Sequence, residues 1–333
     1  MDNGYYTLLN FNTAVIAALV AFGIAVVLGP IVIPILRKLK LGQNVRDDGP
    51  KSHLGKAGTP SMGGIVIVIA VAASSGIFSQ FSNEWMVVMF LMLSYGTIGF
   101  LDDYIKVVKR RSLGLRAYQK FSLQIACAVG FVFLLSHFDI PTLMYVPFSD
   151  GVYLDFGWAT PLVLIFVVVG TANGANFTDG LDGLASGVTL LVCLFFVYAA
   201  FLLDSALGYS LAAASGALLG FLLFNSYPAR VFMGDTGSLA LGGFVAAVAI
   251  VLQMPLLVAI VAFVYVAEIL SVILQVGYFK ISGGKRIFRM SPLHHHFEHL
   301  DPPWKETKIV AVFYIFTAIF CLIGILAIGG AVS

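Results

Sequence analysis

The positions of the basic residues constrain the fold of this chain more than any other feature of its sequence. All 19 Lys and Arg residues lie in, or at the ends of, alternate connections between long apolar segments. Six fall from Arg37 to Lys56, six from Lys106 to Lys120, one is Arg230, and six fall from Lys280 to Lys308. Short loops rich in Lys and Arg stay on the cytoplasmic side of a membrane. The pattern therefore predicts a chain that crosses a membrane repeatedly, with both termini on the outer side.

Composition supports the same fold class. Hydrophobic residues make up 59% of the chain and charged residues 11%, whereas soluble domains carry about 25% charged residues. A bilayer core of about 30 Å takes roughly 20 apolar residues per helix. We predict an all-α polytopic membrane protein that forms a single transmembrane domain over residues 1–333. Its ten predicted spans are 13–36, 61–80, 85–101, 119–136, 159–176, 183–203, 207–224, 236–252, 255–278 and 308–330.

The longest connection on the outer side has the pattern of a β-hairpin. In VPFSDGVYLDF, Asp150-Gly151 stands between alternating strand-like residues, which is a turn signal. A small external hairpin is predicted near 144–156.

Two acidic residues end the third span. A carboxylate at a helix C-terminus opposes the helix dipole, so another interaction must favour Asp102 and Asp103 there. Adjacent helical residues project about 100° apart, so the two carboxylates need not share one ligand. A solvated pair beside the nearby basic residues is the simpler alternative.

Two further acidic loops lie on the basic side. NFTDGLDGLASG holds Asn176, Asp179 and Asp182 without any cation, and helix capping accounts for only one of its Asp residues. Asp235, in FMGDTGSLALGG, either caps the eighth span or binds Mg²⁺, which prefers one or two carboxylates with water and phosphate oxygens. Both loops precede helices of small residues, where unpaired backbone N–H groups are expected to suit phosphate.

Three consecutive histidines, His294, His295 and His296, stand in SPLHHHFE. Three adjacent side chains cannot all face one metal from a regular helix or strand. Hydrogen bonds from the imidazoles to phosphate or sugar are therefore favoured over a zinc site. An incidental polar loop is the alternative.

The roles of the remaining polar residues near span ends depend on which groups lie beside them. Lys56, Lys106 and Lys120 are interfacial cations by position and become phosphate ligands only through proximity to the acidic loops. Glu268 lies inside the ninth span, where a carboxylate is either functional or a hydrogen-bonded packing residue. Acidic, basic and imidazole groups on one membrane face together predict Mg²⁺-dependent handling of phosphates with one partner in the membrane.

Five motifs resemble those of one family, in the family's order. They are KAGTPSMGG, FLDDYIKV, NFTDGLDGLASG, FMGDTGSLALGG and SPLHHHFE. On these motifs the chain resembles the phospho-N-acetylmuramoyl-pentapeptide-transferases of bacterial peptidoglycan biosynthesis. SPLHHHFE is the most specific, because related polyprenyl-phosphate sugar-phosphate transferases carry a differently arranged His motif. Ser61 departs from the Thr frequent in the family but keeps the hydroxyl.

The resemblance implies an activity, a cofactor and partners. Phospho-MurNAc-pentapeptide would pass from UDP-MurNAc-pentapeptide to undecaprenyl phosphate, with Mg²⁺, to give lipid I and UMP. The resemblance also implies a homodimer in the bacterial plasma membrane, with the active site on the cytoplasmic face. A bent ninth helix would border a groove for the lipid tail, and no nucleic-acid partner is expected.

The resemblance also assigns residues of this chain to roles. Asp102, Asp103, Asp235 and His294 match catalytic positions, and Asp235 is the expected Mg²⁺ ligand. The expected substrate-binding residues are Lys56, Lys120, Asn176, Asp179, Asp182, Asn225, Phe232, Gln275, His295 and His296.

Two mechanisms are compatible with these residues. In one, the lipid phosphate attacks the β-phosphate of the UDP-sugar directly, with Asp102 or Asp103 removing any remaining proton. In the other, an Asp attacks first and forms a phospho-enzyme. A phosphomonoester has a second pKa of about 6 and is largely ionised already, which favours direct attack.

The sequence disfavours two other functions. A secondary transporter would place polar residues near the bilayer midplane on repeat-related helices, whereas here they gather at one face without a visible inverted repeat. A relative acting on UDP-N-acetylglucosamine is disfavoured by the His motif.

Overall fold

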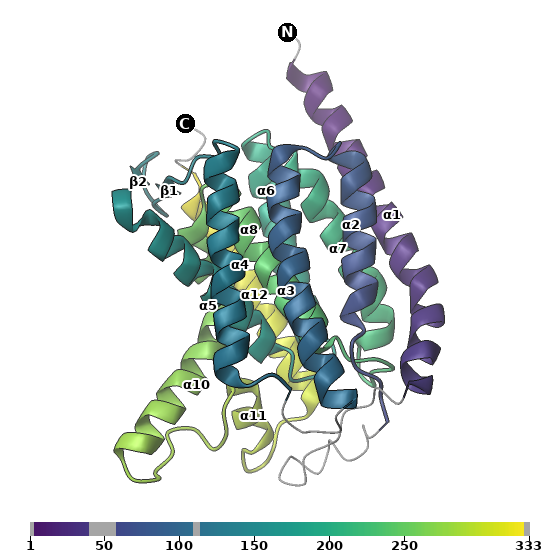
Figure 1. The fold of residues 1–333 in the computed structure, drawn as a ribbon, viewed down its shortest axis with the longest axis vertical. Coiled ribbons are helices and arrows are strands. Elements are labelled where there is room, and N and C mark those ends of the chain that lie inside the picture. Colours follow the sequence, from purple (N-terminus) through teal and green to yellow (C-terminus); the bar gives the residue numbers. More distant parts are fainter. Residues whose placement is uncertain (1–2, 40–57, 109–113, 330–333) are drawn as a thin grey trace.

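The computed structural model describes residues 3–39, 58–108 and 114–329, and the fold in these ranges is almost entirely helical (Figure 1). The long helices are α1 (Asn3–Lys38), α2 (Gly64–Phe78), α3 (Asn83–Val108), α4 (Ala117–His137), α5 (Thr160–Thr178), α6 (Leu184–Leu202), α7 (Leu207–Asn225), α8 (Gly234–Val251), α10 (Phe263–Ile281) and α12 (Glu306–Ala327). The short elements are β1 (Met144–Tyr145), β2 (Tyr153–Leu154), η2 (Gly157–Ala159), η3 (Pro255–Leu257), α9 (Val258–Val261) and α11 (Leu293–Glu298).

Nine helices in the described residues are long and apolar enough to cross a membrane. The predicted class, an all-α polytopic membrane protein, is confirmed. The second predicted span, 61–80, forms the 15-residue α2, which is about 22 Å long at 1.5 Å per residue. This helix starts only at Gly64, because the residues before it bond to another segment.

An irregular backbone segment precedes α2. Phe232 N donates to Pro60 O, and the N–H groups of Gly63 and Gly64 donate to the carbonyls of Phe232 and Met233. Non-helical backbone at membrane depth is tolerated where protein covers it. The pairing also holds the start of α2 against the turn that leads into α8.

The ninth predicted span, 255–278, is broken. α9 ends at Val261. The backbone of the next residue, Ala262 (φ −100°, ψ 35°), departs from helical values, and α10 begins at Phe263. α10 then leans away from the bundle (Figure 1). The bent ninth helix implied by the family resemblance is present.

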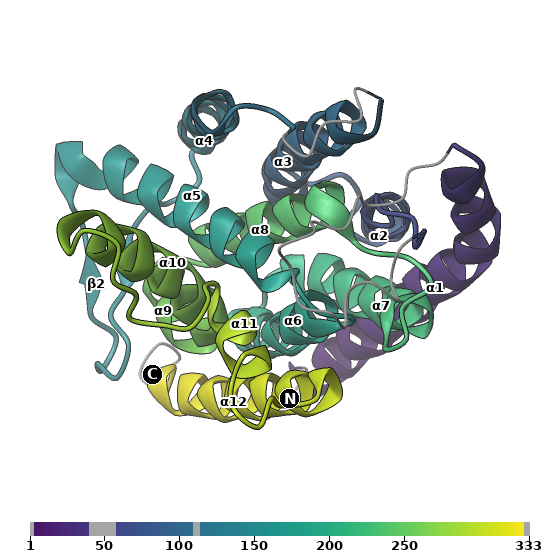
Figure 2. The same cartoon turned by 90° about the horizontal axis from the view of Figure 1, so that it is seen from below.

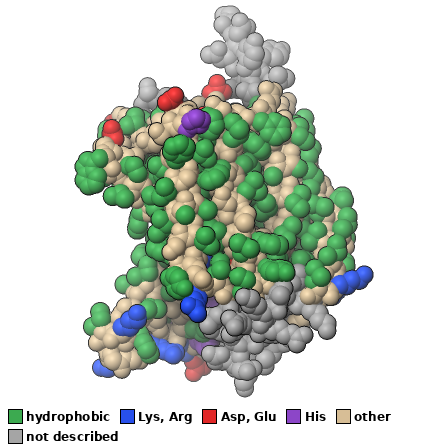
Figure 3. Space-filling model, viewed as in Figure 1, with side chains coloured by type: hydrophobic (Ala, Val, Ile, Leu, Met, Phe, Trp, Pro, Cys, Tyr) green, Lys and Arg blue, Asp and Glu red, His purple; other side chains and the backbone are tan. Residues whose placement is uncertain are grey.

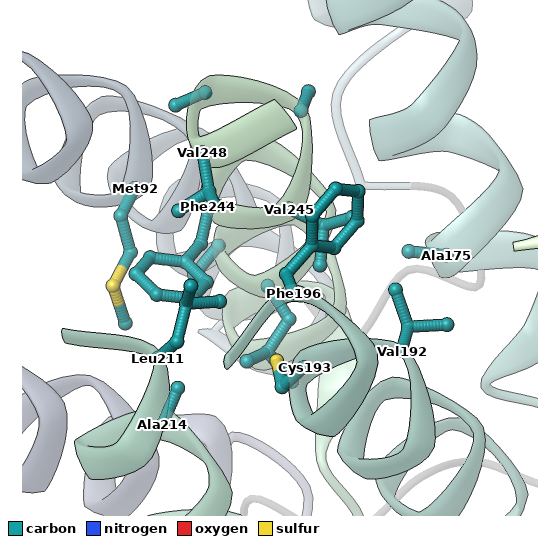
Figure 4. Close-up of a cluster of buried hydrophobic side chains, with 14 of the residues drawn as sticks. Met92, Ala175, Val192, Cys193, Phe196, Leu211, Ala214, Phe244, Val245 and Val248 are labelled. Carbon is teal, nitrogen blue, oxygen red and sulfur yellow. The ribbon is translucent and has the colours of Figure 1, made fainter. Parts of the chain in front are cut away.

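α8 lies at the centre of the bundle. In its apolar window 94% of the residues are buried, against 22% in α4 and 28% in α12. Seen from below, α6, α7 and α8 lie inside a ring formed by the other long helices (Figure 2). Figure 4 shows Phe244 of α8 packing near Met92 and Leu211.

Small residues let neighbouring helices approach α8 closely. A Cβ on Gly99 of α3 would overlap the backbone of Asp235, and one on Gly242 would lie 2.6 Å from Ala172 Cα of α5. Helix packing in membranes relies on such small residues, since the lipid gives no hydrophobic drive. Gly99 stands one turn before Asp103, so this close approach sets the position of that carboxylate.

The two ends of the molecule differ in charge. The described Lys and Arg side chains on the face in Figure 3 gather at one end, and apolar side chains cover the flanks. α1 begins and α12 ends at the opposite end (Figure 1). The arrangement agrees with the predicted charge asymmetry, while the placement of the termini outside remains a prediction.

The predicted hairpin near 144–156 is also confirmed. β1 and β2 pair antiparallel, with Met144 opposite Leu154 and Tyr145 opposite Tyr153. Phe148 N donates to Ala327 O, so the hairpin contacts the end of α12.

Substituting Gly99 tests the close packing of α3 on α8. We expect Gly99→Ala to force the two helices apart and to cost about 1–3 kcal/mol, the usual cost of overpacking. Thermal unfolding in detergent measures the effect. Gly170→Ala is the matched control, because a Cβ there meets nothing within 4 Å. Equal melting temperatures for the two variants would contradict the packing described.

Candidate active site

Three carboxylates converge where α3 ends and α8 begins. Asp102, Asp103 and Asp235 each place an oxygen within 4.8 Å of the others. Asp102 and Asp103 are buried and Asp235 is half-buried. The convergence predicted for these residues is therefore present, although Asp235 lies more than a hundred positions from the other two in the sequence.

Asp103 caps α8 from the neighbouring helix. Its carboxylate accepts hydrogen bonds from Thr236 N at 2.9 Å, Thr236 Oγ1 at 2.8 Å and Asp235 N at 3.3 Å. The first N–H groups of a helix lack intrahelical partners, and a negative charge there is stabilised by the helix dipole. The prediction that these N–H groups are free for phosphate is wrong, because Asp103 accepts from them.

Gly234 makes this cap possible. It has a φ of +73°, and a Cβ there would lie 2.7 Å from both Asp103 Oδ2 and Ser61 Oγ. Glycine adopts this backbone conformation without the steric cost that other residues meet. The turn into α8 can thus bring its backbone directly against Asp103.

Asp102 has different partners. Its Oδ1 accepts from Leu115 N at 2.8 Å, and its Oδ2 lies 2.6 Å from Lys106 Nζ. The two adjacent carboxylates therefore serve separate contacts, as their 100° offset on the helix predicts.

Two lysines neutralise Asp235. Lys106 Nζ lies 3.0 Å and Lys120 Nζ 2.9 Å from Asp235 Oδ2. Asn176 Nδ2 donates to Asp235 Oδ1 at 3.0 Å, and Asn176 Oδ1 accepts from Lys120 Nζ at 3.2 Å. Helices α3, α4, α5 and α8 each contribute to this group.

Asp179 is a further carboxyl group beside the cluster. It is the C-cap of α5 and is half-buried. Burial, together with the charges of Asp235 and Asp103, raises the pKa of Asp179 to about 8. A bound cation would offset the negative charges of Asp235 and Asp103 that contribute to this shift.

Asp182 links the loop between α5 and α6 to two other segments. Asp182 Oδ2 accepts from Ala229 N at 2.9 Å, and Asp182 N donates to Glu306 Oε1 at 2.8 Å. Tyr314 of α12 donates to Gly183 O at 2.7 Å. The loop between α5 and α6 is thus held by α12 and by the segment before α8.

His294 packs against Gly180 in the loop between α5 and α6. Its Nδ1 lies 3.0 Å from Glu268 Oε1, and a Cβ on Gly180 would overlap its Nε2. Since Gly180 follows Asp179, the imidazole and the acidic cluster are gathered around one turn. His294 is buried, and its Nε2 has no hydrogen-bond partner in the described part of the chain.

The other two histidines of the run face different partners. His295 Nδ1 lies 2.6 Å from Glu298 Oε2, and His296 Nδ1 accepts from Arg289 N at 3.1 Å. A neutral His296 therefore carries its proton on Nε2. As predicted from the spacing, the three imidazoles do not converge on one point.

The remaining predicted substrate-binding residues make contacts within the protein. Asn225 bonds to Ser186 Oγ and Val231 O. Gln275 accepts from the N–H groups of Ile287 and Phe288 and donates to Phe288 O, which ties the segment after α10 to that helix.

Two predicted residues complete the set. Phe232 is half-buried in the segment that pairs with Pro60. Lys56 lies outside the described residues. Their roles in substrate binding stay predictions.

The donor set suits a hard divalent cation. All the ligand atoms in the cluster are carboxylate oxygens, which Mg²⁺ prefers to nitrogen or sulfur. Three carboxylates stand against two ammonium groups, so one negative charge is unbalanced before Asp179 is considered. A cation held by Asp235 would release Lys106 and Lys120 for other anions.

Comparison with known proteins identifies the family of this chain. The glycosyl transferase family 4 model matches residues 85–253, and signature 1 of the phospho-N-acetylmuramoyl-pentapeptide-transferases matches residues 56–68. A transferase of that name from Clostridium botulinum (strain Eklund 17B / Type B) is 47% identical over 319 residues, covering 95% of this chain and 97% of the relative. The one from Clostridioides difficile (strain 630) is 48% identical over 315 residues, covering 93% and 96%.

The chain belongs to the phospho-N-acetylmuramoyl-pentapeptide-transferase family. Its acidic cluster lies within the matched region 85–253, whereas His294 and Glu268 lie beyond it. The full-length similarity to the Clostridium relatives covers both parts.

Two residues of this transferase site were not assigned from sequence. Lys106 was treated as interfacial, yet it contacts Asp102 and Asp235; its spacing of three and four residues from Asp103 and Asp102 is the signal that could have found it. The sequence does not distinguish function from packing for Glu268, and only the structure shows its contact with His294.

Replacing the capping carboxylate tests the assembly of this transferase site. We expect Asp103→Asn to lower the free energy of unfolding by about 1–3 kcal/mol, because the amide presents N–H groups to other buried donors. Thermal unfolding in detergent measures it. Asp155→Asn is the control, since Asp155 accepts from Gly157 N in an exposed turn, where Asn caps as well as Asp. An Asp103→Asn variant as stable as this control would count against the cap.

Proposed function

We propose that this chain transfers phospho-MurNAc-pentapeptide from UDP-MurNAc-pentapeptide to undecaprenyl phosphate, forming lipid I and UMP. The names of its relatives support the reaction. The observation that carries the proposal is the convergence of Asp102, Asp103 and Asp235 with two lysines at the basic end of a membrane bundle. A soluble phosphate donor and a lipid phosphate can meet only at such a boundary.

The setting belongs to the same proposal. The chain acts as a single transmembrane domain in the bacterial plasma membrane, with the site on the cytoplasmic face, and it forms a homodimer. The charge asymmetry supports the orientation, since Lys and Arg gather at the end of the molecule that carries the site (Figure 3).

Mg²⁺ is the cofactor that we propose, with Asp235 as its ligand and Asp102 and Asp103 beside it. The oxygen donors and the unbalanced negative charge support this choice. When bound, Mg²⁺ supplies positive charge to the diphosphate of the donor.

The protein's own residues then have distinct tasks. Lys106 and Lys120 bind phosphate oxygens as the diphosphate enters, since ammonium groups stabilise the charge that develops during phosphoryl transfer. Asp103 keeps α8 in place, because its Oδ2 accepts from Thr236 N and Oγ1 and its Oδ1 accepts from Asp235 N. His294 donates from Nε2 to a phosphate or sugar oxygen when its ring is protonated.

Direct attack by the lipid phosphate is the route that the contacts favour. Asp102 and Asp235 are each paired with a lysine, which weakens them as nucleophiles. Asp102 remains the better base of the two, because Asp235 is paired with two lysines and Asp102 with one.

An assay of purified protein tests the proposed function. With Mg²⁺, undecaprenyl phosphate and UDP-MurNAc-pentapeptide we expect UMP release and a lipid-linked product, both abolished by a chelator. UDP-N-acetylglucosamine is expected to release no UMP. Release of UMP only from UDP-N-acetylglucosamine would assign the chain to the related transferases, and release from neither sugar would favour a transporter.

Neutralising the proposed Mg²⁺ ligand gives a sharper test. We expect Asp235→Asn to lower kcat by at least about 100-fold, in the range of losses seen when a main electrostatic group of an active site is removed. Asp155→Asn, at the other end of the molecule, should leave kcat unchanged. Full activity of Asp235→Asn would contradict its role as metal ligand.

A further inference from the structure

Glu268 is a carboxylate buried within a membrane-spanning helix. It lies in α10 and is 0% exposed. Ionisable groups inside a membrane protein are costly unless they are paired, and they are usually functional. Its partners should therefore show what it does.

Within the part of the chain that the structure describes, the hydrogen bonds of the Glu268 carboxylate go to the start of the histidine segment. Oε2 accepts from Leu293 N at 2.6 Å, and Oε1 accepts from His294 N at 3.2 Å. Oε1 also lies 3.0 Å from His294 Nδ1. One carboxylate thus fixes both the backbone and the ring of His294.

The contact with Nδ1 decides which proton the ring carries. A carboxylate accepts only, so Nδ1 must donate and must be protonated. Nε2 is then the atom left for another partner, either as a lone pair or, on a doubly protonated ring, as a second N–H. On a doubly protonated ring, the positive charge of the imidazole would lie beside the carboxylate of Glu268.

The other ring nitrogen shows that this arrangement is more than an anchor for α11. His294 is 1% exposed, yet its Nε2 has no hydrogen-bond partner among the described residues. Buried polar atoms are nearly always paired, so an exception calls for a ligand or a catalytic role. Nε2 faces Gly180 in the loop that also carries Asp179.

Glycine at position 180 fits the same interpretation. Any side chain there would overlap Nε2, so the loop leaves room for the imidazole only because Gly180 has none. The imidazole of His294 is thus held by Glu268 at Nδ1 and packs against the backbone of Gly180 at Nε2.

We propose that Glu268 is a positioning residue for phosphoryl transfer, acting through His294, whose Nε2 it presents to the phosphate-bearing substrate. The inference rests on the proposed function for the reaction, but the Glu268–His294 contact itself does not. Glu268 touches no substrate, and the role of His294 depends on it.

Glu268→Gln is the direct test. The amide keeps the shape but cannot accept from Leu293 N and His294 together without directing its NH₂ group at one of these donors. We expect kcat to fall roughly 10- to 100-fold, as when the partner that orients a functional histidine is removed, with little change in KM. Glu84→Gln, a carboxylate on α3 that accepts from Ser205 Oγ, is the matched control and should keep wild-type kcat.

A spectroscopic measurement separates positioning from simple support of the fold. In protein labelled with ¹⁵N-histidine, the His294 Nδ1–H proton should appear far downfield, as expected for a hydrogen bond to a buried carboxylate. It should move upfield or vanish in Glu268→Gln, while the Nδ1–H signal of His295, held by Glu298, stays in place. A His294→Gln variant assigns the signal.

Gly180→Ala keeps the inference testable if Glu268→Gln does not fold. It leaves the Glu268 carboxylate intact and displaces the ring from the loop, so kcat should fall and the His294 signal should shift. Wild-type kcat in either folded variant would overturn the inference, as would loss of kcat with the His294 signal unmoved. An inactive wild-type protein that retains the downfield signal would instead overturn the proposed function.

Discussion

The hydrogen bonds from the start of α8 to Asp103 are the contact on which the site depends. They join two helices that are distant in the sequence, and they satisfy N–H groups that would otherwise be unpaired in the interior. The same contact brings Asp102 and Asp235 together, because Asp102 is next to Asp103 in the sequence and Asp235 is next to Thr236. Gly99 and Gly234 permit it by leaving space for the backbone. Asp103 thus both caps α8 and forms part of the acidic cluster.

Buried charge in this bundle is organised in two separate groups. The acidic cluster is paired with lysines, and Glu268 is paired with backbone donors and an imidazole. Both groups border the loop between α5 and α6, which α12 holds through Tyr314. Because each group is anchored from several helices, the loop between them is enclosed on more than one side. Such preorganisation suits chemistry that depends on positioning and electrostatics.

Much of this arrangement could be predicted from the sequence, and the limits have physical causes. The helices follow from apolar length, and the hairpin from Asp150-Gly151. The start of α2 was misplaced, because the pairing of Pro60 with Phe232 is a tertiary contact that hydropathy does not encode. Motifs identified the acidic residues, but not that Asp103 caps another helix. The partner of Glu268 lies 26 residues away along the chain, across a loop whose path no local pattern specifies.

Binding of Mn²⁺, measured by the loss of its free EPR signal, tests the central claim most directly. Mn²⁺ replaces Mg²⁺ at oxygen sites and reports binding without turnover. With UDP present, the wild-type protein should bind Mn²⁺, Asp235→Asn should not, and Asp155→Asn should bind as the wild type does. Equal Mn²⁺ binding by wild type and Asp235→Asn would contradict the account, because the carboxylates that converge beside the start of α8 would then not form the cation site.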